Sequence, residues 1–463
     1  MSTPLPAALC TELAAALAGD GFSTSASDLI SYSYDNSRLE SLPQAVAWPR
    51  HRDQVISLVR LCRTHRVPLV ARGQGTNTTG ATVPLHGGIV LSLERMNRII
   101  EIDPDNRAAV VEPGVLNGDL QEALKPHGLF WPPDPTSAAF SSIGGNLACN
   151  AGGPRAVKYG ACRDNVLALD AVAGTGELLR CGSRTTKGAT GYDLTRFLVG
   201  SEGTLAIITQ ATLKLTPLPE TVRTLRALYR DVASAAAAVA RIMRQPATPC
   251  ALEFMDGEAL RLAREIGGAD IPPAGALLMI EVDGSVAAIA AAVEAVSRAA
   301  VGDGLIALDG ARDAVEVQQL WAARKALSPA LRSIAPHKIN EDVVVPVSRV
   351  PDLVAAVTAI SQRSGINIVT FGHAGNGNLH VNLMFDPANE HQAIAAPVAL
   401  GEVFDAVIAL GGTLSGEHGI GMAKRPFMHK AISPATLAMM HAIKAQFDPD
   451  GILNPGKLLP DAR

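Results

Sequence analysis

Two histidines of the chain, His373 and His380, have a spacing that could create a metal site. They are seven residues apart, so on one straight strand their side chains would point to opposite faces. The residues between them include Gly-Asn-Gly-Asn at 375–378, which is typical of a turn and predicts a β-hairpin with one histidine on each arm. Such a hairpin would bring the two imidazoles together and would place Asn382 on the same face as His380.

A third ligand could come from the loop at residues 415–421, Ser-Gly-Glu-His-Gly-Ile-Gly, whose glycines permit a close approach. Its Glu417 offers a carboxylate, and His418 follows directly. Two imidazoles and one carboxylate that leave coordination positions open suit Zn²⁺, Mn²⁺ or Fe²⁺. From the pattern alone, a polar cleft in which these histidines only form hydrogen bonds stays an open alternative.

Three glycine-rich segments, at residues 72–80, 132–153 and 187–204, could bind a second kind of ligand. Small residues let a backbone approach a ligand closely, and successive N–H groups can bind phosphate oxygens. Simple turns are the alternative interpretation of each segment taken alone.

Two common nucleotide-binding motifs are disfavoured. The G-x-G-x-x-G dinucleotide motif fails because Thr78 stands where Gly73 and Gly75 require a third glycine. Residues 451–457 imitate a P-loop, but Leu458 replaces the required Ser or Thr. A nicotinamide enzyme of the Rossmann type and a P-loop nucleotide hydrolase are therefore not indicated.

The composition describes a folded protein of more than one domain. The 463 residues include 48% hydrophobic and 18% charged residues, with a formal net charge of −4. This length indicates two or three domains. Lys and Arg are scattered, so no basic face for a nucleic acid is indicated.

The chain shows no targeting pattern, and a cytoplasmic location is expected. Its N-terminus lacks the basic and apolar regions of a signal peptide, and no stretch approaches the roughly 18 uncharged apolar residues of a membrane span. The six cysteines are dispersed without a C-x-x-C pair. That argues against iron–sulfur and zinc–thiolate sites and fits a reduced protein.

Alternating short elements predict an α+β fold in two units. In the first, residues 45–72 read as strand, helix and strand, and residues 165–181 read as a hairpin. Prolines within residues 213–220 indicate a linker. The second unit alternates strands with helices, which predicts helices packed on a largely antiparallel sheet. These helices are expected near residues 231–243, 258–266, 286–300 and 396–410.

Three strings resemble the flavoprotein superfamily of vanillyl-alcohol oxidase and p-cresol methylhydroxylase. They are IGGNLACNAGGPRAVKYGACRDNVLAL at residues 143–169, FLVGSEGTLAIIT at 197–209 and FDPDGILNPGKLL at 447–459. Within it, the chain resembles the branch with D-2-hydroxyglutarate dehydrogenase, flavin D-lactate dehydrogenase and the glycolate oxidase flavin subunit, over about residues 35–460. Ala206 is a small departure, since many relatives carry glycine there.

The resemblance implies an α+β fold with a two-subdomain, p-cresol methylhydroxylase-type FAD-binding domain and an α+β cap domain with an antiparallel sheet. We expect the FAD-binding domain at residues 1–219, with its core at about 38–217. Residues 220–415 would form the substrate-binding cap domain, and residues 416–463 would return to the FAD-binding domain.

FAD is the cofactor that the resemblance implies. The loops at residues 72–80 and 143–153 would hold its pyrophosphate, and residues 197–209 would lie near its adenine half. Some superfamily members attach flavin through a histidine in the first loop, which is missing here, so we expect non-covalent FAD. The residues expected to bind it are Arg72, Gly73, Gln74, Gly75, Thr76, Asn77, Thr78, Gly80, Pro133, Asp134, Ser137, Ser142, Ile143, Gly144, Gly145, Asn146, Asn150, Gly153, Tyr159, Gly160, Glu202, Gly203, Ile207 and Asn454.

The resemblance also assigns the metal ligands and the base, because residues 373–382 and 415–421 match the family segments that carry them. His373, His380 and Glu417 would bind a divalent metal, for which Zn²⁺ is expected, and His418 would be the catalytic base. The metal would lower the pKa of a bound 2-hydroxyl group, His418 would accept its proton, and hydride from C2 would pass to FAD.

Four residues would bind the substrate. Arg324 lies on a predicted helix and resembles the family arginine that clamps a carboxylate, although from sequence alone a surface helix charge is the alternative. Lys338 resembles a second substrate cation of the family. Ser328, one helical turn after Arg324, and Asn382 would add polar contacts.

The implied function is metal-assisted oxidation of a small D-2-hydroxy acid to the 2-oxo acid by an FAD-dependent dehydrogenase. D-2-hydroxyglutarate and D-lactate are the first candidates, and glycolate and D-malate stay open. The electrons would pass to an external acceptor, which could be an electron-transfer flavoprotein, a quinone or a cytochrome. A homodimer is one assembly that we expect. Four alternatives remain: a metal-dependent hydrolase, a non-catalytic FAD-binding subunit that passes electrons within a complex, a glycolate oxidase-type FAD subunit, and a metal-free FAD alcohol oxidase.

Overall fold

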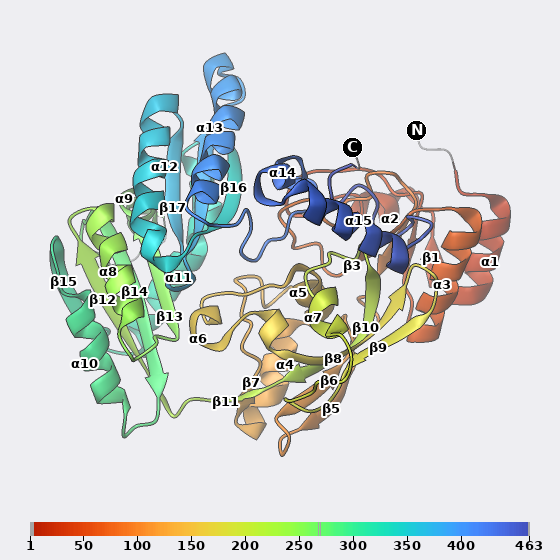
Figure 1. Ribbon diagram of the computed structural model, residues 1–463, viewed down its shortest axis with the longest axis horizontal. Coiled ribbons are helices and arrows are strands. Elements are labelled where there is room, and N and C mark those ends of the chain that lie inside the picture. The colour runs from red at the N-terminus through yellow and green to blue at the C-terminus, as the bar shows by residue number, and fades with distance from the viewer. Residues whose placement is uncertain (1–3, 267, 269, 462–463) are drawn as a thin grey trace. The chain divides into compact units, whose positions relative to one another are not determined.

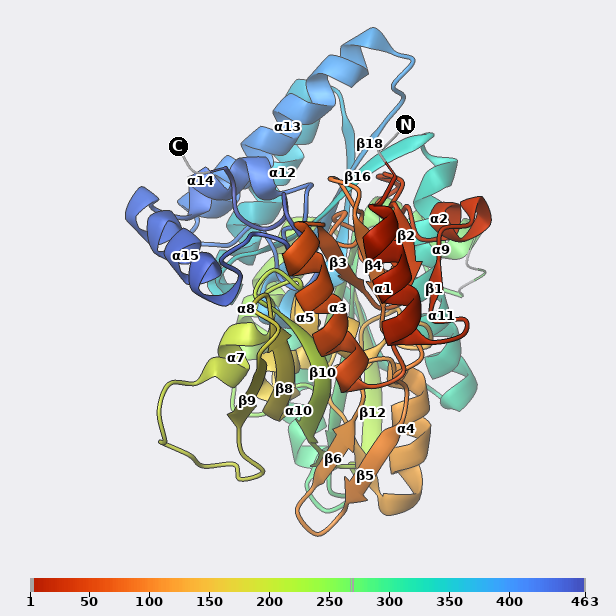
Figure 2. The same cartoon turned by 90° about the vertical axis from the view of Figure 1, so that its right-hand side faces the viewer.

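The computed structural model describes residues 4–266, 268 and 270–461, and Figure 1 and Figure 2 show it from two sides. The chain divides into two compact units. The first unit contains Met1–Gly152, Gly160–Leu218 and Glu417–Arg463, and the second unit contains Gly153–Tyr159 and Pro219–Gly416. The segment Gly153–Tyr159 lies within the range expected for the FAD-binding domain, but its contacts join it to the second unit.

The first sheet of the first unit has four strands, in the order β1 (Phe22–Ser23), β2 (Ala45–Ala47), β4 (Ile89–Ser92) and β3 (Leu69–Arg72). The last three run parallel, and β1 is antiparallel to β2. Helix α3 (Arg52–His65) buries Val55, Leu58, Val59 and Cys62, the spacing of an amphipathic helix. This confirms the strand, helix and strand predicted at residues 45–72. Helix α1 (Ala7–Leu17) packs on α3, and α2 is Ala26–Ser31.

The second sheet of the first unit is antiparallel, in the order β5 (Ile99–Asp103), β6 (Ala108–Val111), β10 (Ala206–Lys214), β8 (Val166–Ala173) and β9 (Leu178–Gly182). The pair β8 and β9 confirms the predicted hairpin. Trp131 is fully buried in the core of this sheet, where its Nε1 donates to the carbonyl of Asn165 at 2.9 Å. Shorter elements nearby in sequence are α4 (Asn117–Leu124), β7 (Leu129–Phe130), α5 (Ile143–Cys149), α6 (Ala156–Tyr159), α7 (Leu194–Leu198) and β11 (Thr216–Pro217).

The C-terminal segment of the first unit contains α14 (Met428–Ala431), α15 (Pro434–Phe447) and a tail. In the tail, Leu453 forms a parallel bridge with Leu69 on β3. On α15, the Nζ of Lys444 donates to the carbonyl of Leu453 at 2.9 Å and to that of Thr204 at 2.6 Å. These bonds hold the tail against elements that precede it by more than 200 residues in the chain.

One antiparallel sheet of seven strands forms the centre of the second unit. Its order is β15 (Leu305–Gly310), β12 (Thr221–Tyr229), β14 (Ala276–Gly284), β13 (Ala251–Asp256), β17 (Asn367–His373), β18 (Asn378–Phe385) and β16 (His337–Val344). The predicted α+β class and antiparallel sheet are therefore confirmed.

Two groups of helices pack on this sheet. Helices α9 (Gly257–Glu265) and α11 (Ala314–Ala330) share a core cluster with residues of β13, β14 and β17. Helix α8 (Val232–Arg244) packs against α10 (Ile289–Ala300) and α12 (Val350–Ser364), and α12 packs against α13 (Glu390–Ala409), as Figure 1 shows. Helix α12 was not among the helices expected from the sequence.

Helix α13 is long and apolar enough to cross a membrane by length and composition, with a mean hydropathy of 1.5, although a third of its most apolar window is buried in the second unit. It packs against α12 and β18 and carries Glu402 and Asp405. Core helices of folded domains meet the same test, so the helix is weak support for a membrane location. Because Glu402 and Asp405 interrupt it, the helix is not the uncharged apolar stretch by which the sequence would indicate a membrane span.

We predict that Phe254→Ala lowers the free energy of unfolding of the second unit by about 3–5 kcal/mol, because a fully buried ring on β13 would leave a cavity. Urea unfolding followed by circular dichroism measures the loss. Phe140→Ala removes the same atoms from a ring that is 72% exposed and should change stability little. Equal losses in the two variants would contradict the assignment of Phe254 to the core.

Candidate active site

The two predicted metal-binding histidines lie on neighbouring strands of the second unit. β17 ends at His373, a 3-10 turn (η5, Ala374–Asn376) reverses the chain, and β18 carries His380. The predicted hairpin is confirmed, and Gly377 adopts a φ of +73°, which L side chains rarely adopt. The two imidazole rings are nearly perpendicular with centroids 5.2 Å apart, and both side chains are buried.

The third candidate ligand, Glu417, follows Gly416, which is hydrogen-bonded to strand β16. Asp342 on β16, opposite His380, accepts a hydrogen bond from the backbone N–H of Gly416 at 2.9 Å. Glu417 is the next residue, and one ligand atom each of Glu417, His373 and His380 lie within 4.8 Å of one another. Two imidazoles and a carboxylate at this spacing can converge on one divalent cation, so the residues present fit the implied metal.

A buried glutamate that the sequence analysis had not singled out, Glu253, contacts this histidine pair. It lies on β13 opposite His373 and is 0% exposed. Its Oε1 is 2.6 Å from Nδ1 of His373, and its Oε2 accepts a hydrogen bond from Nε of Arg324 at 2.8 Å. Burial alone would raise the pKa of Glu253, but its interactions with His373 and Arg324 outweigh burial and lower that pKa to about 2.

A signal for Glu253 was present in the sequence. Residues 250–256, Cys-Ala-Leu-Glu-Phe-Met-Asp, read as a buried strand, and a glutamate inside such a strand needs a charged or hydrogen-bonding partner. The sequence did not identify that partner, because His373 and Arg324 are 120 and 71 residues away in the chain.

Arg324 lies on α11 and is buried, so its interpretation as a surface helix charge is wrong. Its guanidinium also lies 4.8 Å from the ring centroid of Phe371 on β17. Asn382 is fully buried on β18, and its Oδ1 accepts no hydrogen bond from any residue that the structure describes. Lys338 on β16 donates from Nζ to Oγ of Ser328 at 2.7 Å.

The strand register collects these residues on one face of the sheet. Asn382 and His380 alternate to the same side of β18, and Asn382 pairs with Asn340, which shares a side of β16 with Lys338. Glu253, opposite His373, connects this face to Arg324 on α11. The structure therefore brings all four predicted substrate-binding residues and the two histidines to the same side of one sheet.

The first two glycine-rich segments contact each other in the first unit. A Cβ on Gly73 would lie 2.3 Å from Oγ of Ser142, so only glycine fits where the loop at residues 72–80 meets the start of α5. A Cβ on Gly145 would have only that hydroxyl within 4 Å, so the backbone there has open space beside it. This open space permits a ligand to approach the backbone closely.

The loop at residues 73–78 offers a row of hydrogen-bond donors. No residue that the structure describes accepts a hydrogen bond from its backbone N–H groups. Within the same described part of the chain, the buried Oγ1 of Thr78 has no hydrogen-bond partner either. Successive backbone N–H groups with a nearby hydroxyl suit phosphate oxygens, so this loop fits the pyrophosphate of FAD.

Two residues expected to bind FAD, Asn77 and Glu202, contact the loop that carries His418, and a third, Asn454, contacts Glu202. Asn77 donates from Nδ2 to the carbonyl of His418 at 2.9 Å. The carboxylate of Glu202 accepts from the backbone N–H of Ile420 at 2.6 Å and of Gly421 at 2.8 Å, and burial raises the pKa of Glu202. Asn454 donates to the carbonyl of Glu202 at 2.7 Å. These bonds fix the backbone at and directly after the predicted base.

Several other residues expected to bind FAD have contacts within the protein. Arg72 donates to the carbonyl of Tyr34 at 2.7 Å, which braces the start of the first loop. Ile207 is buried in the core beside the first sheet. Tyr159, in the second unit, donates to Asp283 at 2.7 Å, and burial raises its pKa.

The remaining predicted residues are placed by their segments. Asn146 within α5 and Asn150 at its C-terminal end bond to protein groups, and the others lie in or beside the glycine-rich loops. These others are Gln74, Gly75, Thr76 and Gly80 in the first loop, Pro133, Asp134 and Ser137 before α5, Ile143 and Gly144 in α5, Gly153 and Gly160 around α6, and Gly203 before β10.

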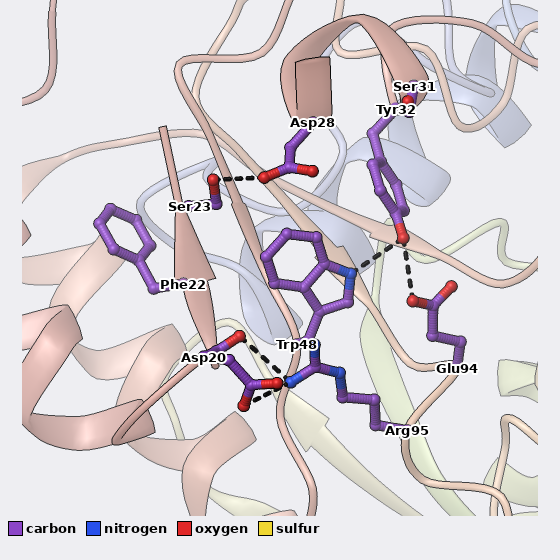
Figure 3. A pocket seen from close by; sticks show the side chains of 9 residues that line it. All are labelled: Asp20, Phe22, Ser23, Asp28, Ser31, Tyr32, Trp48, Glu94 and Arg95. Atoms are coloured by element: carbon purple, nitrogen blue, oxygen red, sulfur yellow. Dashed lines mark hydrogen bonds and ion pairs between the residues drawn. The ribbon is translucent and has the colours of Figure 1, made fainter. Parts of the chain in front are cut away.

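A surface pocket of about 500 Å³ in the first unit is not the candidate site (Figure 3). Its charged and polar side chains bond to one another: the hydroxyl of Tyr32 donates to Glu94 at 2.9 Å, and Arg95 lies 3.0 Å from Asp20. No residue expected to bind FAD, metal or substrate lines it.

Comparisons with known proteins show which family the chain belongs to. Residues 43–182 match the FAD binding domain family, and residues 218–458 match the family of FAD linked oxidases, C-terminal domain. The chain is 41% identical to glycolate oxidase subunit GlcD of Bacillus subtilis (strain 168), over 96% of this chain and 95% of that protein. It is 34% identical to D-2-hydroxyglutarate dehydrogenase of Stutzerimonas stutzeri (strain A1501), over 94% of this chain and 95% of that protein.

The structure is also similar to that of p-cresol methylhydroxylase with substrate bound, with a TM-score of 0.83 over 98% of this chain and 96% of that one, at 17% identity. The fold is therefore that of the p-cresol methylhydroxylase-type flavoproteins. The chain belongs to the FAD-linked oxidases, as an FAD-dependent oxidoreductase of the D-2-hydroxy acid and glycolate oxidase type, which confirms the family identified from the sequence.

We predict that Glu202→Gln loosens the loop at residues 415–421, because an amide nitrogen would face one of the two N–H groups that the carboxylate now binds. The loss should be about 1.5–3 kcal/mol, as for hydrogen bonds to a charged group. Faster amide hydrogen exchange across residues 415–421, measured by mass spectrometry, is the expected result. The exposed Glu177→Gln is the matched control, and equal exchange in both variants would exclude this role of Glu202.

Proposed function

We propose that this enzyme oxidises a small D-2-hydroxy acid to the 2-oxo acid, with a divalent cation at His373, His380 and Glu417, and that its electrons pass to an external acceptor. The convergence of these three ligand groups carries the proposal. One of them, Glu417, directly precedes His418 in the chain. The family supplies the flavin chemistry that such a site needs.

FAD, when bound, takes up the hydride equivalent from C2 of the substrate. The backbone N–H groups of residues 73–78 and the hydroxyl of Thr78 would hold its pyrophosphate, since they have no acceptor or partner among the residues described. The flavin would be bound without a covalent link, because the loop at residues 72–80 contains no histidine.

His418 would accept the proton of the substrate 2-hydroxyl. Asn77 holds its carbonyl, and Glu202 holds the two backbone N–H groups that follow at Ile420 and Gly421. This bracing limits how far the imidazole can move, which a general base requires. A divalent cation, when bound, lowers the pKa of the hydroxyl that His418 deprotonates.

Arg324 would bind the substrate carboxylate. Its Nε is engaged by Glu253, which fixes the plane of the guanidinium for a bidentate contact. The Oδ1 of Asn382 is an acceptor that a substrate hydroxyl could satisfy. Lys338 already donates to the hydroxyl of Ser328, so a second substrate carboxylate would compete with this hydroxyl for the Lys338 ammonium group.

Glycolate joins D-lactate and D-2-hydroxyglutarate as a first candidate substrate. The chain is more similar to the glycolate oxidase subunit, at 41% identity, than to the D-2-hydroxyglutarate dehydrogenase, at 34%. An acid with one carboxylate would need only Arg324, and it would leave the contact of Lys338 with Ser328 intact.

A panel of D- and L-2-hydroxy acids, assayed with a dye acceptor with and without EDTA, tests the proposal. We expect a D-acid or glycolate to bleach the flavin absorbance, EDTA to abolish turnover, and added Zn²⁺ or Mn²⁺ to restore it. A flavin-free protein that cannot be reconstituted would refute the proposal. Turnover that EDTA does not affect would support a metal-free oxidase, and a flavin that no acid reduces would support a non-catalytic subunit.

Two alanine variants separate the proposed metal from the proposed base. His380→Ala should lose the metal and most activity but keep FAD, because FAD is assigned to the loops of the first unit. His418→Ala should keep metal, FAD and substrate binding while the rate of flavin reduction falls by about 10²- to 10⁴-fold, the usual contribution of a general base. Elemental analysis, flavin absorbance and stopped-flow reduction measure the three properties. Near-normal flavin reduction in His418→Ala would refute the base assignment.

A further inference from the structure

The carboxylate of Glu253 joins two functional groups that are far apart in the chain. One oxygen is 2.6 Å from Nδ1 of His373, and the other accepts from Nε of Arg324 at 2.8 Å. Glu253 is 0% exposed, and the side chains of His373 and Arg324 are only 6% and 7% exposed. One buried side chain therefore contacts a proposed metal ligand and the proposed carboxylate-binding residue.

The contact with Glu253 decides which nitrogen of His373 can bind a cation. The guanidinium of Arg324 stays protonated, and a positive charge in direct contact favours the ionised form of Glu253, which only accepts hydrogen bonds. The Nδ1 of His373 must then carry the hydrogen in this contact. Its Nε2 is left as the nitrogen with a lone pair for the cation, and the ring orientation is fixed by the same bond.

The charge of Glu253 has a second effect. A divalent cation bound by His373 and the guanidinium of Arg324 would both be positive in a site shielded from water, and like charges repel strongly there. A carboxylate that contacts both partners offsets this repulsion. The site can then hold a cation and a carboxylate-binding arginine together.

We propose that Glu253 is a positioning residue that orients His373 for the metal and Arg324 for the substrate carboxylate. This inference rests on the proposed function and deepens it. Glu253 touches neither substrate nor metal; it acts through the two side chains that do. A merely structural ion pair, the competing interpretation, would affect stability without affecting metal affinity.

Glu253→Gln tests the proposal, because glutamine has the same shape but only one acceptor oxygen for two N–H donors. Glu281→Gln is a matched control. Glu281 is a buried glutamate on the neighbouring strand β14, on the same face of the sheet, and its carboxylate accepts from Thr224 at 2.9 Å and from Trp321 on α11 at 2.8 Å.

The measurement is Zn²⁺ content of the full-length FAD-bound enzyme after equilibrium dialysis against buffered Zn²⁺, followed by the KM for the best 2-hydroxy acid at saturating Zn²⁺. Glu253→Gln should weaken Zn²⁺ binding by about 10- to 100-fold, the usual effect of losing a carboxylate that supports a metal-binding histidine. It should also raise KM, because Arg324 loses its orientation. Its flavin content should match that of the wild type, and Glu281→Gln should match the wild type in Zn²⁺ affinity and KM.

The outcomes distinguish the inference from the proposed function. If Glu253→Gln binds Zn²⁺ as tightly as the wild type does, the inference alone is overturned, even if the variant is less stable. A wild-type enzyme that binds neither Zn²⁺ nor Mn²⁺ would overturn the proposed metal site and the inference with it. If Glu253→Gln does not fold, Glu253→Asp decides: it keeps the charge but is one methylene shorter, so unchanged Zn²⁺ affinity would overturn the inference and weaker binding would support it.

Discussion

A buried carboxylate stays ionised in a protein only where opposite charges or hydrogen-bond donors contact it. Two buried glutamates show how the candidate site depends on this constraint. Glu253 is 0% exposed in the second unit and is met by His373 and Arg324. Glu202 is 5% exposed in the first unit and is met by two backbone N–H groups of the loop that follows His418. Glu253 therefore fixes two side chains that the proposed chemistry uses, and Glu202 fixes the backbone that follows the proposed base.

Local sequence predicted those parts of the site that depend on turn chemistry. The hairpin that pairs His373 with His380 follows from Gly-Asn-Gly-Asn, and the contact of Gly73 with Ser142 fits two segments in which small residues allow a close approach. The α+β class followed from the alternation of short elements, because hydrophobic periodicity is a local property.

Tertiary partners could not be predicted in this way. Glu253 read as one polar residue in an apolar strand, and its role depends on a sheet register that joins β13 to β17 across more than 100 residues. The segment Gly153–Tyr159 is continuous with the FAD-binding sequence, yet its Lys158 and Tyr159 bond to Asp283 of the second unit. Such pairings arise from long-range packing, which no local pattern encodes.

The row of backbone donors at residues 73–78 has a consequence for how the enzyme matures. A ligand that binds only the folded state stabilises that state by mass action. Bound flavin would thus complete the hydrogen bonding of the first unit as well as serve the reaction. The folded fraction of the enzyme would then rise with the flavin supply, so a shortage of flavin would lower the amount of folded protein as well as its turnover.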